Sequence, residues 1–188
     1  MSDTYNFQAY VDQHISVMNS LSSQSELIQE MTLKIRKYIA TGGTIFTMGN
    51  GGSASDAQHF TGELIGRFKQ NRRALKSVCL NTDTSVLTCI ANDYGYDEIY
   101  SRQIEALASD KDLVVLFSTS GNSKNIVRAA QTCIAKNINC ILFTGKTGGE
   151  LAKLCSNILS VNTDVTARIQ EAHIFLIHFI CESLEDLK

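Results

Sequence analysis

The chain has 188 residues, 44% hydrophobic and 19% charged, with a net charge of −2. This length suits one domain, residues 1–188, whose core needs no disulfide bridges, and the composition is not that of a disordered chain. The slightly acidic balance lacks the basic surface typical of nucleic-acid binding, so DNA and RNA are disfavoured as partners.

Two amphipathic helices are predicted ahead of the first strand. Residues 4–20 and a second stretch after a serine-rich break carry apolar side chains near helical spacing. Ser23 and Glu26 match a capping box for the second helix, and Gly42 with the following glycine predicts its end. Residues 1–41 therefore form an N-terminal helical arm. Its apolar face covers the sheet of its own subunit or, alternatively, a neighbour.

A glycine-rich turn follows. The apolar run 44–48 ends in three glycines within four residues and continues into a segment with no helix breaker except Gly62. This pattern predicts a strand, a tight turn and a helix, whose first N–H groups can meet an anion. If Ser53 caps the helix, His59 and Glu63 lie on one face. Acid–base or metal chemistry is one interpretation, and a solvated His/Glu pair on a surface helix is the other.

Further apolar runs predict strands at 77–80, 112–118, 138–144 and 157–161. Their continuous apolarity is typical of strands buried on both faces, and segments between them, such as 122–136, are predicted to be helices. Alternating strands and helices indicate a doubly wound, parallel α/β sheet. Ligands bind at the carboxyl ends of such strands, which places the glycine turn, Ser118 and Thr144 along one rim.

The loop 118–123 directly follows the most apolar strand and precedes a helix that begins near Lys124. Four hydroxyl side chains, a glycine and a helix N-terminus form a cradle for phosphate. An ordinary capped turn explains one or two of these hydroxyls but not the others, so the phosphate interpretation is favoured.

Asn92 and Asp93 interrupt a helical pattern with polar groups that can hydrogen-bond sugar hydroxyls. The same residue types are also common in helix–helix connections, so this signal is weak by itself.

The segment 167–181 predicts a helix that is apolar on most sides and therefore buried. Gln170 and His178 fall on one face of it and need partners, because an unpaired buried polar group costs roughly 1 to 3 kcal/mol. One interpretation is that both are core residues whose hydrogen bonds are made within the protein. The other is that, together with His59 and Glu63, they supply nitrogen and oxygen ligands for zinc or another divalent ion. Whether the two helices meet stays open.

The six cysteines form no C-x-x-C pair and lie mostly in apolar runs. We expect reduced core residues and a cytoplasmic protein. Charged side chains near the N-terminus argue against a signal peptide, and no apolar run reaches the roughly 18 residues of a membrane span.

Four motifs in this order, GNGGSASDAQHFTGEL, CIANDYGY, STSGNS and RIQEAH, resemble those of sugar isomerase (SIS) domain proteins, and most closely the phosphoheptose isomerase (sedoheptulose 7-phosphate isomerase) family. The resemblance covers nearly the whole chain. It implies a single SIS domain with a five-stranded parallel sheet flanked by helices, in a homotetramer with shared active sites. It also implies conversion of sedoheptulose 7-phosphate to D-glycero-D-manno-heptose 7-phosphate, the first step toward activated heptose for lipopolysaccharide or other surface glycans.

The resemblance also assigns residues. Its substrate-binding positions fall on Asn50, Gly51, Gly52, Asn92, Asp93, Ser118, Thr119, Ser120, Ser123 and Gln170. Its metal set falls on His59, Glu63, Gln170 and His178, with one divalent ion, expected to be zinc, per subunit. Residues 71–75 depart from the family, which often carries prolines there, and leave that loop's conformation open.

An isomerase of this kind moves a proton between C1 and C2 through an enediol, so a base and an acid must flank both carbons. We assign Glu63 as the base and His178 as the acid. A carboxylate on a cation is a poorer base, which leaves two readings open. Either Glu63 shifts off the metal while the metal polarises the substrate oxygens, or the ion mainly organises the site.

Two alternatives remain at this stage. One is a non-catalytic SIS-domain regulator that binds the DNA-replication initiator protein and lacks the base and acid. The other is an isomerase of a different sugar phosphate.

Overall fold

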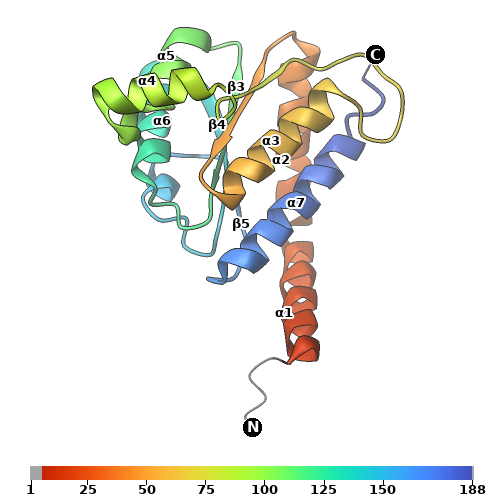
Figure 1. Ribbon diagram of the computed structural model, residues 1–188. Helices are drawn as coiled ribbons and strands as arrows, with labels where there is room; N and C mark the ends of the chain where they lie inside the picture. Colours follow the sequence, from red (N-terminus) through yellow and green to blue (C-terminus); the bar gives the residue numbers. More distant parts are fainter. Residues whose placement is uncertain (1–5, 188) are drawn as a thin grey trace.

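The computed structural model describes residues 6–187, in which a parallel sheet lies between two layers of helices (Figure 1). The strands are β1 (Ile45–Gly49), β2 (Ser77–Cys79), β3 (Leu113–Ser118), β4 (Asn139–Thr144) and β5 (Ile158–Ser160). The helices are α1 (Phe7–Ser20), α2 (Ser25–Ala40), α3 (Gly52–Ile65), α4 (Thr84–Tyr94), α5 (Ser101–Leu107), α6 (Lys124–Ala135) and α7 (Thr166–Glu182). Short 3₁₀ turns are η1 (Leu21–Gln24), η2 (Tyr96–Glu98) and η3 (Leu151–Lys153).

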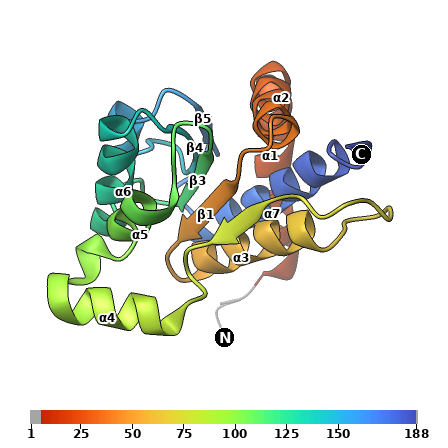
Figure 2. The same cartoon turned by 90° about the horizontal axis from the view of Figure 1, so that it is seen from above.

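Both faces of the sheet are covered by helices. Helices α2, α3 and α7 pack on one face and α5 and α6 on the other, whereas α4 projects from the end of the body (Figure 2). Alternate residues of β3 supply the two cores, since Val115 and Phe117 join the α2–α3–α7 side and Val114 and Leu116 the opposite side. The continuous apolarity of the strands follows from this burial, and the predicted doubly wound sheet is confirmed.

The strand order is β2-β1-β3-β4-β5, and all neighbours are parallel. Pairing of β1 with β3 runs from Ile45 opposite Leu113 to Gly49 opposite Phe117. The chain leaves β1 toward one edge of the sheet and returns past it to β3, so the order reverses between these two strands. In open α/β sheets, ligands bind in the crevice at such a switch point, beyond the carboxyl ends of the strands.

The N-terminal arm forms, but its predicted capping box is wrong. Helix α1 continues into α2 through η1, so the chain offers no extended residue at which Ser23 could cap, and the Ser23 hydroxyl donates instead to the carbonyl of Ser20 at 2.8 Å. The glycine stop is confirmed, because α2 ends at Ala40 and Gly42 has φ +86°. Positions 4 and 5 of the predicted first helix lie outside the described residues.

The arm packs on its own chain. The buried Arg168 of α7 donates through Nη1 to the carbonyl of Tyr10 at 2.8 Å and lies 3.8 Å above that ring, while His14 of α1 pairs with Glu171 at 2.7 Å. One face of α7 stays uncovered, however, with Phe175 53% exposed. The prediction of a helix buried on most sides is therefore wrong for that face. No helix within residues 6–187 is both long and apolar enough to cross a membrane.

Candidate active site

The glycine turn joins β1 to α3 at the switch point. Gly51, with φ +56°, is the N-cap of α3, and the helix begins at Gly52. Ser53 is buried inside the first turn, so the expectation that it caps the helix is wrong. A Cβ atom on Gly52 would collide with the side-chain amide of Gln170, so a larger residue there would displace that side chain. The structure thus places Gln170 against the glycine turn.

Asn50 is held by side chains that the sequence analysis did not identify. Asn50 and Asn125 exchange two amide hydrogen bonds, of 2.8 and 2.9 Å, and the Tyr96 hydroxyl donates to Asn50 Oδ1 at 3.2 Å. Asn125 belongs to the first turn of α6, so this pair links the glycine turn to the loop 118–123. The position of Asn125 beside the STSGNS motif is the signal that could have identified it.

The end of β1 is also supported by Tyr100, the N-cap residue of α5, and by the loop after β2. The Tyr100 hydroxyl donates to the carbonyl of Gly49 at 2.6 Å, and Asn81 bonds both the N–H and the carbonyl of Gly49, at 3.2 and 2.8 Å. Burial raises the pKa of Tyr100 far above its usual value, so the phenol remains a donor. These contacts fix the strand end from which Asn50 projects.

The loop 118–123 contains one buried and three accessible hydroxyls. The Ser118 hydroxyl is buried and accepts from the N–H of Gly121 at 3.2 Å, so it supports the turn. Thr119 and Ser123 are half-buried and Ser120 is exposed, so these three are accessible to a ligand, although the Ser120 hydroxyl also accepts from the N–H of Asn122 at 3.2 Å. Gly121 has φ +67° and packs so closely on the backbone of Gly148 that no Cβ would fit.

Helix N-termini gather at this rim. Helices α3, α4, α6 and α7 each follow a strand, and the carboxyl ends of parallel strands share one edge of the sheet. Among these four, only α4 has a side-chain cap, from Asp83. The first N–H groups of α3, α6 and α7 thus lack a capping side chain, and their partial positive charge favours an anion such as phosphate.

The helices α3 and α7 bring three candidate residues together within one chain. His59 Nε2 lies 3.3 Å from Glu63 Oε1 and 3.0 Å from His178 Nε2, and the ring of Phe68 stacks on His178 at a centroid distance of 5.5 Å. Gln170 precedes His178 by eight residues, about 12 Å along α7, and is not part of this cluster. The question left open by the sequence is answered, because the two helices do meet.

The donor atoms of this cluster suit a divalent ion. Imidazole nitrogen and carboxylate oxygen are zinc ligands, and two ligands of a tetrahedral zinc lie about 3.3 Å apart, close to the separations around His59. In residues 6–187, however, no group of three or more His, Cys, Asp or Glu side chains is arranged to hold a metal ion. The chemistry of the donors fits zinc, whereas the side chains as they lie do not enclose it.

A buried acid and base lie at the α3–α7 interface and were missed by the sequence analysis. Asp56 Oδ2 lies 3.9 Å from His173 Nδ1, and neither atom has a hydrogen-bond partner among the described residues. Burial raises the pKa of Asp56 to about 7 and lowers that of His173 to about 4. The imidazole packs on the rings of Phe117 and Phe143. Helical spacing from His59 and Gln170 is the signal that could have located both residues.

Asn92 and Asp93 are exposed near the end of α4. Within the described chain, the hydrogen bonds of their side chains join the two residues at 2.8 Å and connect Asp93 to the thiol of Cys89 at 3.7 Å. The structure therefore does not join them to either rim loop.

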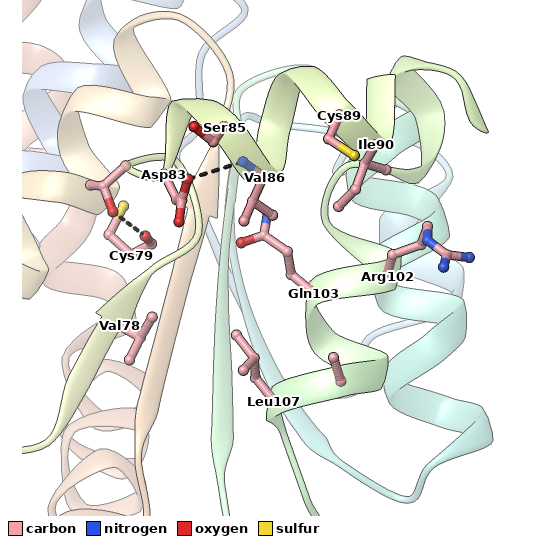
Figure 3. Close-up of a pocket in the computed structure, with 12 residues that line it drawn as sticks. Val78, Cys79, Asp83, Ser85, Val86, Cys89, Ile90, Arg102, Gln103 and Leu107 are labelled. Carbon is pink, nitrogen blue, oxygen red and sulfur yellow. Dashed lines mark hydrogen bonds between the residues drawn. The ribbon is translucent and has the colours of Figure 1, made fainter. Parts of the chain in front are cut away.

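A separate cavity of about 810 Å³ lies between β2, α4 and α5 (Figure 3). Its wall is mainly apolar, with Val78, Ile90 and Leu107 facing it and Asp83 at one side bonded to the N–H of Val86 at 2.9 Å. None of the predicted site residues lines it. It lacks the uncapped helix N-termini and the hydroxyl loop that suit a sugar phosphate, so the rim is the better candidate.

Comparison with known proteins bears on the family to which the chain is similar. The sequence model of the SIS domain matches residues 9–145. A phosphoheptose isomerase from Campylobacter jejuni is 45% identical over 166 residues, or 86% of this chain and 89% of that protein. The structure of a phosphoheptose isomerase from Neisseria gonorrhoeae superposes with a TM-score of 0.89 at 36% identity, covering 96% and 97% of the two chains. One from Francisella tularensis gives 0.93 at 28% identity, covering 98% and 99%.

Proposed function

Because this chain belongs to the phosphoheptose isomerase family of SIS-domain proteins, we propose that it converts sedoheptulose 7-phosphate to D-glycero-D-manno-heptose 7-phosphate. The observation that carries the proposal is the meeting of Glu63 and His178 around His59, on two helices that both start at an anion-binding rim. A regulator without catalysis needs no such acid–base pair, and the relatives compared above are named as isomerases.

The reaction divides between the two parts of the site. The phosphate binds the loop 118–123 and the N-terminus of α6, remote from the reacting carbons, and so supplies binding energy that holds C1 and C2 in place. Glu63 takes the proton from C1 and returns it to C2. His178 donates a proton to the carbonyl oxygen on C2 as the enediol forms, and recovers one from the hydroxyl on C1 as the aldehyde forms. Protons balance over the cycle.

We also propose a divalent ion, zinc in the first instance, held by His59, Glu63 and His178 with Gln170 as the fourth group of the set. When bound, such an ion supplies a positive charge that stabilises the substrate oxygens. The separations of 3.3 and 3.0 Å around His59 support this assignment. Gln170 could join only with movement, since it now lies against Gly52.

The assembly and compartment are further proposals. We propose a homotetramer with shared active sites, and an exposed apolar face on α2 and α7, including Leu33 and Phe175, supports association between chains. The thiols of Cys140 and Cys155 lie 3.5 Å apart and are free, which supports a reducing cytoplasm. There the product would enter heptose synthesis for surface glycans.

The function is tested by incubating the protein with sedoheptulose 7-phosphate and following the aldose signal by NMR. We expect turnover by the wild type and loss of at least about 100-fold in kcat for Glu63→Gln and for His178→Ala, because each lacks one proton carrier. Glu26→Gln and His14→Ala remove the same groups far from the cluster and should retain activity. Substantial turnover by either site variant would refute the acid–base assignment, and turnover of only a shorter sugar phosphate would favour the other isomerase.

The metal is tested by elemental analysis of the purified protein and by assays before and after chelation. We expect about one ion per chain and restoration of the lost activity on adding Zn²⁺. His59→Ala should lose the ion while keeping its circular dichroism spectrum. Full activity in metal-free protein would show that the ion is incidental.

A further inference from the structure

The Asn50–Asn125 pair is a cross-link between the two halves of the site. Asn50 lies directly before α3, which carries His59 and Glu63, and Asn125 lies in the first turn of α6, beside the phosphate loop. Two amide hydrogen bonds of 2.8 and 2.9 Å join them. The distance between the starting points of these two helices is therefore set by side-chain amides as well as by the sheet.

Asn125 is committed to this contact. Its side chain is buried, with only 2% of the residue exposed, and its Oδ1 also accepts from the N–H of Ile126 at 2.9 Å. Asn50 Oδ1 accepts from Asn125 and from Tyr96 as well. A reciprocal amide pair of this kind permits one separation and orientation, because a shift lengthens both bonds together.

The substrate must bridge the two parts that this pair connects. Its phosphate sits at the loop 118–123, whereas His59 lies seven residues along α3 from Gly52, about 10 Å down the helix axis. A sugar phosphate reacts only if its carbon chain spans that interval. The interval therefore determines which chain lengths can react. A misplacement of about 1 Å in such a geometry can cost about 100-fold in rate.

We propose that Asn125, by holding Asn50, is a specificity-determining positioning residue that sets the chain length of the sugar phosphate accepted. The inference rests on the proposed function, since it assumes phosphate on the serine loop and proton transfer at Glu63 and His178. The side chain of Asn125 is buried and does not itself reach the substrate. The loop 118–123 keeps its own supports, such as the bond from the N–H of Leu151 to the carbonyl of Gly121 at 3.0 Å.

The test compares Asn125→Ala with the wild type on ligands of different length. The measurements are kcat/KM for sedoheptulose 7-phosphate and the inhibition constants of fructose 6-phosphate and inorganic phosphate. We expect kcat/KM to fall about 100-fold. Both inhibition constants should change less than about threefold, because the phosphate groups of these ligands are held by the loop 118–123 and by backbone N–H groups at the start of α6, which Asn125→Ala keeps. The preference for the seven-carbon chain over the six-carbon chain then falls more than tenfold.

A matched control is Asn157→Ala. Asn157 is also a buried asparagine whose amide is hydrogen-bonded at both ends, since it donates to the carbonyl of Cys140 at 3.0 Å and accepts from Lys34 at 2.7 Å. It precedes β5, however, at an edge of the sheet. The Asn157→Ala variant should be less stable than the wild type but should keep the same preference for the seven-carbon over the six-carbon chain. If Asn125→Ala does not fold, Asn125→Asp keeps the side-chain volume and removes only the donor to Asn50. Its added charge should weaken all three ligands by a common factor, and the inference requires that sedoheptulose 7-phosphate lose about a further tenfold relative to fructose 6-phosphate.

The outcomes separate the inference from the function. Wild-type protein without turnover of sedoheptulose 7-phosphate refutes the proposed function. The inference is overturned if the wild type is active but an Asn125 variant weakens the binding of all three ligands by the same factor, or of none of them. The proposed function then still stands. In a double-mutant cycle, Asn50→Ala with Asn125→Ala should be no worse than Asn50→Ala alone, because the second change removes a contact that Asn50→Ala has already removed. Fully additive losses would also contradict a shared role.

Discussion

Asp56 and His173 place an acid and a base together in the interior with opposite shifts of their pKa values. Burial raises the pKa of Asp56 from 3.8 to about 7, so its contribution to stability is present below pH 3.8 and is lost as the pH rises through 7. The pKa of His173 falls from 6.5 to about 4, so its contribution is present above pH 6.5 and is lost as the pH falls through 4. Between about pH 4 and 6.5 the two effects oppose one another.

Asp56→Asn should therefore gain stability relative to the wild type as the pH rises. The variant cannot acquire the buried charge, so the difference in free energy of unfolding should grow by roughly 2–3 kcal/mol between pH 5 and 8 and level off above pH 7. Urea unfolding at several pH values measures it. Asp110→Asn removes an exposed carboxyl and should show no such slope. An equal difference at pH 5 and pH 8 would mean that Asp56 does not titrate in this window.

The candidate residues show which parts of a site can be predicted from residues that are close together in the sequence. His59 and Glu63 share one helix, so their spacing alone predicted that they would lie together. The contact of His59 with His178 joins α3 to α7 across 119 residues, and only the packing of the two helices on the sheet decides it. Asn125 was missed because its partner, Asn50, is distant in sequence and the strand order that brings them together has no local signal.

At the scale of elements, the end of α3 depends on one arginine from the loop that follows it. The carbonyls of the last turn of a helix lack intrahelical partners. Arg72 donates to the carbonyl of Leu64 at 3.0 Å and to that of Glu63 at 2.7 Å, and its Nε lies 3.6 Å from the buried carboxylate of Glu185. The sequence left the conformation of the loop 71–75 open, because the loop lacks the prolines that the family often carries. In the structure, Arg72 anchors this loop to the end of α3.

Arg72→Met should destabilise the fold by roughly 3–5 kcal/mol, because it removes the cationic partner of the buried Glu185 carboxylate and the donor to the carbonyl of Glu63. Arg72→Lys should recover only part of the loss, since one ammonium does not reproduce the guanidinium fork. Chemical denaturation measures both. Arg128→Met, which removes an exposed arginine 3.5 Å from Glu98, is the control and should cost at most about 1 kcal/mol. A loss for Arg72→Met no larger than that of the control would exclude the anchoring role.

Strands were easier to predict than caps and short helices. The central strands predicted at 112–118 and 138–144 begin one residue later, at Leu113 and Asn139, and end where expected, because burial on both faces leaves a continuous apolar run. Both predicted serine caps failed, since η1 and the glycine turn set the backbone before those helices. The seven-residue α5 is too short to show a helical period, and no boundary was predicted for it.

At the scale of the whole molecule, the described residues 6–187 leave an apolar surface on α2 and α7 uncovered. Leu33 of α2 is 64% exposed, and Phe175 and Phe179 of α7 are 53% and 41% exposed. Two hollows of about 260 and 290 Å³ border the Phe179 ring. Helix α1 also extends beyond the sheet (Figure 1). Large exposed side chains over adjoining helices mark a protein interface, and a second copy of the chain is the occupant expected from the proposed tetramer.

Phe175→Glu should break this assembly. A carboxylate placed in an apolar interface has to lose its water without a partner, which weakens association. Light scattering should give the wild type a mass of four chains of 20.7 kDa each, and the variant a smaller one. Ile134→Glu alters an equally exposed apolar residue, on α6 in the opposite layer, and should leave the mass unchanged. If the active sites are shared between subunits, turnover per chain should fall with the mass when Phe175→Glu is diluted. A wild type that is monomeric, or a variant that keeps the full mass, would remove the tetramer from the proposal while leaving the chemistry of Glu63 and His178 intact.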